Sequence, residues 1–360
     1  MKSEIKNTKK YASDLQTILS IREIQAKSTE YEKHFQSCLQ NKYLDEISIE
    51  STIDVKINDI LNVDRFGSIK VEKSPSSTIE IYRTKGRHAQ IMVPKAKTWT
   101  NDVKLELKRK LSTSCDYSPG GCVTRKGEFI ITYHEINYAK VLAINAEGEV
   151  ENTILITEPS SAFDVESIDE STVAVSTGYC KKRGISIIDM TKKKIIKFIE
   201  LPDYPYGISY NGKSLICCVE CKDLILISFT DYSITTIPHT TQALYSYVSA
   251  DANKIFFTNP VNHTVACCSY SGALMWKFKD KRVLNYPHGI TINNNGYVFV
   301  VGMDSCNVVV ISPDGKQCKQ ILTKKDGLDM PRSVYFDKLR NHLLVTNYKQ
   351  LAFVYNVSYS

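Results

Sequence analysis

The residues of this sequence that could bind a ligand are aromatic and basic side chains in loops between predicted strands. Tyrosine and arginine anchor protein interfaces, and aromatic rings interleaved with cations also suit single-stranded RNA. A scattered surface set with no ligand fits the same residues, so a protein partner, RNA and no ligand all remain open. The set that we expect on one face consists of Tyr133, His134, Tyr179, Lys181, Lys182, Arg183, Tyr206, Lys222, Tyr245, His263, His288, Asn307, Arg332 and Lys349.

Catalytic chemistry has weaker support in the sequence. His134, His263 and His288 fall in predicted loops that could converge on a metal ion, as in some metal-dependent hydrolases and lyases. A single histidine in such a loop is more often a hydrogen-bonded structural residue. No residue of the sequence stands out as a nucleophile or a general base. We therefore predict a non-catalytic binding module without cofactor or metal. A metal-dependent hydrolase or lyase is the competing class.

The eleven cysteines favour a reducing compartment. Cys217-Cys218 and Cys267-Cys268 lie in apolar runs typical of strands, where neighbouring side chains point to opposite faces, so they suit a core better than a disulfide framework. Cys218 and Cys221 form a C-x-x-C without a second pair at zinc spacing. No secretory leader or apolar run of about 20 residues is found. We expect a cytoplasmic protein that does not bind membranes.

Positive charge is concentrated in the N-terminal third. Residues 1–112 hold 21 of the 46 Lys and Arg and 15 of the 39 Asp and Glu, which leaves 25 basic and 24 acidic residues in 113–360. The basic stretch from Arg83 to Lys110 reads as a solvated face, or as a patch for RNA or an acidic partner. Residues 113–360 are nearly neutral and therefore attract RNA only weakly at long range. A protein partner is accordingly favoured over RNA.

A four-strand repeat positions the candidate residues. Its clearest copy spans residues 288–322, with hairpin turns at Asn295-Gly296 and Asp314-Gly315. Six copies follow one another at intervals of 39 to 44 residues, which is typical of β-propeller blades. The sequence thus predicts a mainly β fold, a six-bladed propeller over residues 99–360.

The sixth copy has only three strands before residue 360. Upstream of the first copy, Val103–Leu111 shows the period-two alternation of a strand. Closing the ring removes unpaired backbone edges. We therefore expect Val103–Leu111 to pair beside Leu351–Val357 as the outer strand of the sixth blade.

The segment before the propeller is expected to be helical over residues 1–64. Apolar residues spaced 3-4-3-4-3 from Ile21 to Cys38 resemble a coiled-coil seam, and Ser51–Asn62 carries a second amphipathic pattern. The first helix could pack on its own chain or mediate self-association. Residues 65–98 are expected to form a connector, in which the alternating runs 68–71 and 79–82 could make a small hairpin.

Three repeat starts carry a family resemblance: Tyr286-Pro287-His288-Gly289-Ile290, Tyr204-Pro205-Tyr206-Gly207-Ile208 and Met330-Pro331-Arg332-Ser333-Val334. Behind a helical segment, they resemble the NHL-repeat members of the tripartite-motif (TRIM) family. The resemblance implies the substrate- or RNA-recognition half of a ubiquitin ligase. The paired Cys and His ligands that a zinc-binding RING and B-box need are not seen, since the first cysteine is Cys38 and the next is Cys115. Ligase activity is therefore expected only within a longer protein or an assembly; a rigid oligomerisation scaffold is the other non-catalytic alternative.

Overall fold

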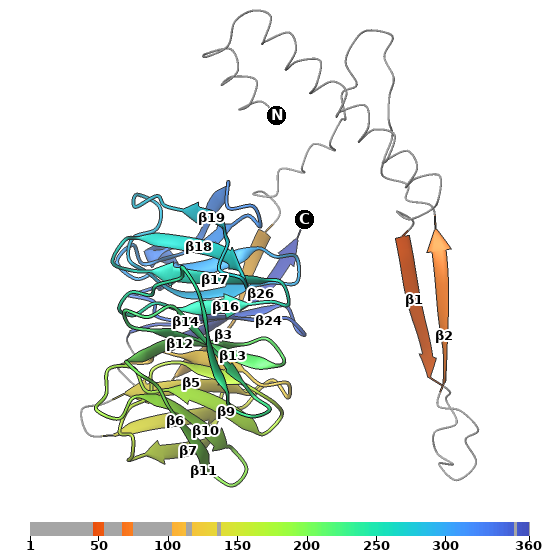
Figure 1. The fold of residues 1–360 in the computed structure, drawn as a ribbon. Coiled ribbons are helices and arrows are strands. Elements are labelled where there is room, and N and C mark those ends of the chain that lie inside the picture. The colour runs from red at the N-terminus through yellow and green to blue at the C-terminus, as the bar shows by residue number, and fades with distance from the viewer. Residues whose placement is uncertain are drawn as a thin grey trace, which may run out of the picture. The chain divides into compact units, whose positions relative to one another are not determined.

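The structure is a computed structural model that describes residues 46–53, 67–74, 103–112, 117–134, 138–348 and 351–359. The chain divides into two compact units, residues 1–96 and 97–360, and each is described by itself. In the first unit, β1 (Glu46–Ile53) pairs antiparallel with β2 (Gly67–Ser74), as Figure 1 shows.

Strand β1 corrects part of the helical expectation for residues 1–64. The helix expected over Ser51–Asn62 is wrong at residues 51–53, which belong to β1. Isoleucines at positions 47, 49 and 53 recur with the period of a strand, and β-branched residues favour strands. The run 68–71 lies in a strand, as expected, but its partner is β1. Residues 54–62, the run 79–82 and the coiled-coil-like stripe lie outside the described residues, so the coiled coil stays a prediction.

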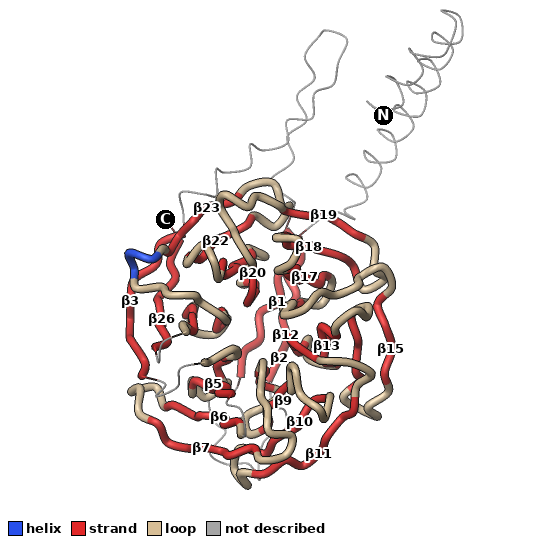
Figure 2. Tube along the Cα trace, turned by 90° about the vertical axis from the view of Figure 1, so that its left-hand side faces the viewer, coloured by secondary structure: helices blue, strands red, loops and turns tan. Residues whose placement is uncertain are grey.

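The second unit contains six four-stranded antiparallel sheets, which Figure 2 shows as a ring. The prediction of a six-bladed propeller is confirmed. Blades 1 to 3 comprise β4 (Gly121–Val123), β5 (Phe129–His134), β6 (Ala139–Ile144), β7 (Val150–Ile156); β8 (Val165–Ser167), β9 (Thr172–Ser176), β10 (Gly184–Asp189), β11 (Lys194–Glu200); and β12 (Pro205–Tyr210), β13 (Ser214–Val219), β14 (Leu224–Ser228), β15 (Ile234–Ile237). Blades 4 to 6 comprise β16 (Val248–Ala250), β17 (Lys254–Asn259), β18 (Thr264–Ser269), β19 (Leu274–Phe278); β20 (Pro287–Ile292), β21 (Val298–Gly302), β22 (Asn307–Ile311), β23 (Cys318–Leu322); and β24 (Val334–Asp337), β25 (His342–Thr346), β26 (Leu351–Tyr359), β3 (Val103–Ser112).

Strand β3 closes the ring. It pairs antiparallel with β26, from Leu351 opposite Ser112 to Tyr359 opposite Val103. The predicted closing strand is therefore confirmed, one residue longer than expected. Leu111 packs in a cluster that contains residues of both the first and the sixth blade, so the closing strand also joins these two blades.

Helix is nearly absent from the part of the chain that the structure describes. The one helical element there is a 3-10 turn, η3 (Lys324–Asp326). None of the helices described is long and apolar enough to cross a bilayer.

Buried hydroxyl groups connect neighbouring blades near the axis. Thr132 Oγ1 accepts a hydrogen bond from the Gly120 N–H at 2.9 Å and donates one to the Phe163 carbonyl of the next blade at 2.7 Å. Ser176 and Thr346 make the same pair of bonds in blades 2 and 6. Because these groups are buried, each bond is expensive to lose, and the inner strands are held in a fixed relative position.

At two repeat starts, Gly207 and Gly289, there is no room for a larger residue than glycine. A Cβ on Gly207 would lie 2.4 Å from the Tyr247 Cα, and one on Gly289 would lie 2.6 Å from the Ser333 Cα. Both distances are far shorter than a carbon–carbon contact allows. The inner strands of adjacent blades therefore approach closely only because no side chain stands there.

Candidate functional site

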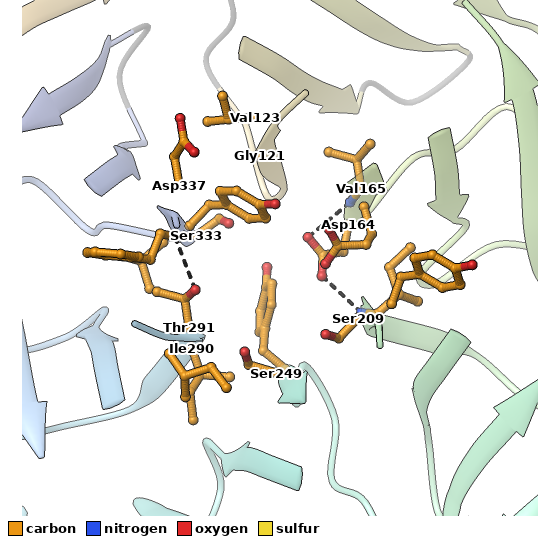
Figure 3. A pocket seen from close by; sticks show the side chains of 18 of the residues that line it. Gly121, Val123, Asp164, Val165, Ser209, Ser249, Ile290, Thr291, Ser333 and Asp337 are labelled. Atoms are coloured by element: carbon orange, nitrogen blue, oxygen red, sulfur yellow. Dashed lines mark hydrogen bonds between the residues drawn. The ribbon is translucent and has the colours of Figure 1, made fainter. Parts of the chain in front are cut away.

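The six inner strands surround a cavity of about 600 Å³ on the propeller axis, shown in Figure 3. At one end it is bordered by the turns that join the first and second strands of blades 1 and 6, where Arg125, Lys338 and Leu339 are exposed. At the other end it reaches Tyr247. The cavity thus extends from exposed turns at one face of the ring to the buried Tyr247 toward the other.

Two carboxyl groups of blade 2 line this cavity. Asp164 accepts hydrogen bonds from the N–H groups of Val165 at 3.0 Å and of Ile208, in the next blade, at 2.9 Å. Burial raises the pKa of Asp164 to about 7, although these bonds oppose the shift. Burial and then the charge of Asp164 raise the pKa of Glu166 to about 8. The pair therefore holds protons at neutral pH that exposed carboxyl groups would release.

Hydroxyl groups line further parts of the cavity wall. Ser209 Oγ accepts from the Ala250 N–H at 3.2 Å, and Thr291 Oγ1 accepts from the Phe336 N–H at 3.1 Å. Each of these hydroxyls still has its own proton to donate. The wall therefore combines hydrogen-bond donors with the carboxyl acceptors of blade 2.

An aromatic cluster crosses the axis at the end of the cavity that Tyr247 borders. Phe163 stacks on Tyr245 with ring centroids 6.1 Å apart, and His288 lies 5.7 Å from Tyr247. This end belongs to what we call the loop face, formed by the loops before each inner strand and between the second and third strands. The aromatic cluster consists of Phe163, Tyr206, Tyr245, Tyr247 and His288.

Four predicted site residues from repeat starts meet in or beside this cluster. Tyr206 and His288 are 0% and 1% exposed, so they are packed inside, while Tyr245 is half-buried. The Arg332 guanidinium lies 5.1 Å from the centroid of the Tyr117 ring. Burial, and then the charge of Arg332, lower the pKa of His288 to about 3, so His288 is neutral at pH 7. These residues are brought together, but two of them offer a partner almost no surface.

The other two candidate histidines of the sequence make structural contacts. His134 Nδ1 lies 3.1 Å from Ser161 Oγ, and His263 Nδ1 accepts a hydrogen bond from the Tyr286 N–H at 3.0 Å. In the described residues, no three His, Cys, Asp or Glu side chains are grouped so that they could hold a metal ion. The three histidines considered for a metal site therefore do not form one.

Two further predicted residues also have structural roles. The Asn307 amide donates to the Val283 carbonyl at 2.7 Å and to Gln320 Oε1 at 2.9 Å. Tyr133 is buried, and the Lys140 ammonium lies 5.7 Å from its ring centroid. Lys222 is exposed on its loop, whereas Lys349 lies outside the described residues.

The exposed candidates gather on the loop face at blade 2. Tyr179 is 70% exposed, and its ring centroid lies 4.7 Å from that of Tyr204. The Arg183 guanidinium lies 4.3 Å from the Tyr204 ring and 3.5 Å from Asp203. The Gly178 N–H donates to the Pro205 carbonyl at 2.8 Å, which fixes the loop to blade 3. We call Tyr179, Lys181, Lys182, Arg183 and Tyr204 the blade-2 rim.

An open groove of about 730 Å³ runs beside the blade-2 rim. It lies between residues 157–160 and residues 180–183. Lys182 crosses it to Glu158 at 3.1 Å and covers the Phe198 ring at 4.8 Å, while Lys181 is exposed. The rim therefore presents an exposed aromatic ring, cations and a depression together.

Several loops of this face have unusual backbone conformations. Six non-glycine residues there have a left-handed φ between 46° and 60°, in a region that such residues rarely adopt. Such conformations persist only where the surrounding structure imposes them, so these loops are held in place. The six are Cys221, Tyr245, His263, Tyr286, Cys306 and Met330.

The fold and the axial cavity define the chain as a six-bladed β-propeller whose axial cavity has polar and apolar walls. No family model matches it, and no curated protein matches its sequence. Virginiamycin B lyase from Staphylococcus aureus superposes with a TM-score of 0.51 at 18% identity, over 71% of this chain and 99% of the lyase. A streptogramin B lyase gives 0.51 at 13% identity, over 73% of this chain and 99% of its own. A protein of unknown function from Bacteroides thetaiotaomicron superposes with a TM-score of 0.56 at 10% identity, over 71% of this chain and 76% of that protein. Identities this low show a shared fold alone.

Proposed function

We propose that this chain is a non-catalytic binding module that recognises a protein partner through the blade-2 rim. The observation that supports this most is Tyr179, an aromatic ring that is 70% exposed yet held against Tyr204 beside a groove. Tyrosine and arginine on a rigid support contribute most to affinity at protein interfaces, because little conformational freedom is lost on binding.

Local charge favours a protein over RNA. The cations Lys181, Lys182 and Arg183 share the groove with Glu158 and Glu200. Asp203 lies 3.5 Å from Arg183, so the local charge is balanced. A nucleic acid needs a net positive surface to neutralise its phosphates. A protein surface with both charge signs and an apolar anchor fits this arrangement better.

The resemblance to the NHL-repeat members of the TRIM family adds a more specific role. In this role the chain recognises the substrate within a ubiquitin-ligase assembly in the cytoplasm. It rests on the repeat starts and the expected helical segment, including its predicted self-association. The neighbouring lyases share the fold only, so the hydrolase or lyase alternative gains no residue from them. A rigid oligomerisation scaffold remains the non-catalytic alternative.

Affinity purification with quantitative mass spectrometry tests the proposal. The tagged full chain is compared with the double variant Tyr179→Ala/Arg183→Ala and with Leu339→Ala, which changes a 73% exposed side chain at the other end of the axis. We expect specific partners to be lost from the double variant and kept by Leu339→Ala. Identical partner sets for all three proteins would contradict binding at the rim.

A further inference from the structure

We propose that the axial cavity binds a small, neutral, hydroxyl-rich molecule about the size of a monosaccharide or a cyclitol. This site is separate from the blade-2 rim, because the cavity opens among Arg125, Lys338 and Leu339, on turns at the opposite face. A ligand there and a partner at the rim would not compete for surface.

The space is adequate for such a ligand. A volume of about 600 Å³ lies within the roughly 300–1,000 Å³ range of small-molecule sites. Tyr247 borders the end toward the loop face, where its hydroxyl donates to the Pro119 carbonyl at 2.7 Å. The ligand would therefore enter from the turn face and stop against Tyr247.

Two hydroxyls of the cavity wall are available to a ligand. Ser249 and Ser333 are only 8% and 4% exposed, and neither hydroxyl has a hydrogen-bond partner in the described part of the chain. Figure 3 shows Ser249 beside the same space as Asp164. Neither oxygen is among the side-chain atoms that the described structure closes off from solvent, so each hydroxyl is free to bond with water or with a ligand in the cavity.

The carboxyl pair supplies the complementary groups. A carboxylate only accepts hydrogen bonds, whereas a protonated carboxyl also donates one. Because Asp164 and Glu166 keep protons near neutral pH, they offer both kinds of bond to the hydroxyls of a ligand. Ser209 and Thr291 add two further donors.

The charge distribution favours a neutral ligand. Carboxyl groups line the wall, while Arg125 and Lys338 stand at the mouth, so neither a cation nor an anion meets one sign of charge throughout. Ile208, Val248 and Ile290 line the same cavity and can contact the C–H faces of a ring. Alternating polar and apolar wall groups match a carbocycle or sugar ring that carries hydroxyls.

Saturation-transfer NMR on the full chain tests the proposal with myo-inositol, glucose and choline, and broadening of the phosphorus-31 line reports binding of a fourth probe, inorganic phosphate, which carries no proton to observe. We expect transfer to myo-inositol or glucose. Ser249→Leu, which fills the cavity, should abolish it, and Ser249→Ala should weaken binding about threefold to tenfold, since one hydrogen bond is lost. Ser271→Leu, on an exposed turn of the same blade, is the matched control and should bind like the wild type.

Each result decides the question. Should Ser249→Leu fail to fold, Ser249→Ala measures the same contact without added volume. The inference is wrong if neither neutral probe binds, if only choline or only phosphate binds, or if Ser249→Leu and Ser249→Ala both bind like the wild type. The last pattern would mean that the probe contacts the outer surface, and the absence of binding would mean that the cavity holds only water.

Discussion

Truncating Leu111 should destabilise the whole propeller, because this side chain joins the closing strand to the first blade. Leu111 is 1% exposed and packs with Val123, Phe129 and Val354, which belong to blades 1 and 6. Removing a fully buried leucine side chain costs about 2–5 kcal/mol, since apolar burial is lost and a cavity remains. For a domain of this size, about 1 kcal/mol lowers Tm by roughly 2–4 °C, so Leu111→Ala should lower it by roughly 5–15 °C.

Leu107 provides the matched control on the same strand. Its side chain is 44% exposed, so Leu107→Ala should change stability by less than about 1 kcal/mol. Thermal and urea denaturation followed by circular dichroism measure the Tm and the free energy of unfolding of both variants. A single transition for Leu111→Ala would indicate that the ring unfolds as one unit. Equal losses of unfolding free energy for the two variants, or a urea midpoint of Leu111→Ala like that of the wild type, would contradict the role of Leu111 in closing the ring.

Three further predictions concern the axis of the ring. Because the pKa values of Asp164 and Glu166 are raised to about 7 and 8, the folded chain binds more protons than the unfolded one as these groups titrate. The free energy of unfolding should therefore fall by about 1–3 kcal/mol from pH 6.5 to 8.5; a level or rising value from urea melts would contradict the burial of this pair. Gly289→Ala should lower Tm strongly, since the added Cβ would lie 2.6 Å from the Ser333 Cα, and a melting curve like the wild type would argue against the close approach. Thr132→Val keeps the side-chain shape but removes two hydrogen bonds, so calorimetry should show a loss of about 1–3 kcal/mol; no loss would mean that the bond between blades 1 and 2 is unimportant.

The propeller could be predicted because its signals are local. Each blade is a chain of hairpins, and turns such as Asn295-Gly296 and Asp314-Gly315 fix them within a few residues; both glycines have the left-handed φ that such turns use. The closing strand was predictable for a different reason. The alternation in Val103–Leu111 shows a strand that needs a partner, and the incomplete sixth copy supplies one.

The sites were harder to predict because they depend on how the blades meet. Asp164 lies just before an inner strand, and only the assembled ring places its carboxyl group beside the N–H of Ile208, 44 residues away. Tyr206 and His288 were expected on a binding face, but aromatic rings from neighbouring blades cover them. The exposure of Tyr179 likewise follows from the loop path rather than from the residue type. Two acidic residues at the start of one inner strand, Asp164 and Glu166, were the available signal for the cavity.

The helical expectation failed at residues 51–53 because strand pairing outweighed the local pattern. The isoleucines of Ser51–Asn62 fit a helical stripe, but those at 47, 49 and 53 also fit a strand. The antiparallel register with β2 selects the second solution. A short apolar pattern often fits both the period of a helix and the period of a strand, and pairing with a second strand then decides between the two.

Site-specific photo-crosslinking tests most directly whether the blade-2 rim binds a protein. A photoreactive phenylalanine analogue replaces Tyr179 in the full chain within cells, and a second protein carries it at Leu339 as the control. We expect protein adducts of discrete mass at position 179 that survive RNase treatment and do not form at position 339. Adducts that disappear with RNase, or identical adducts at both positions, would contradict it.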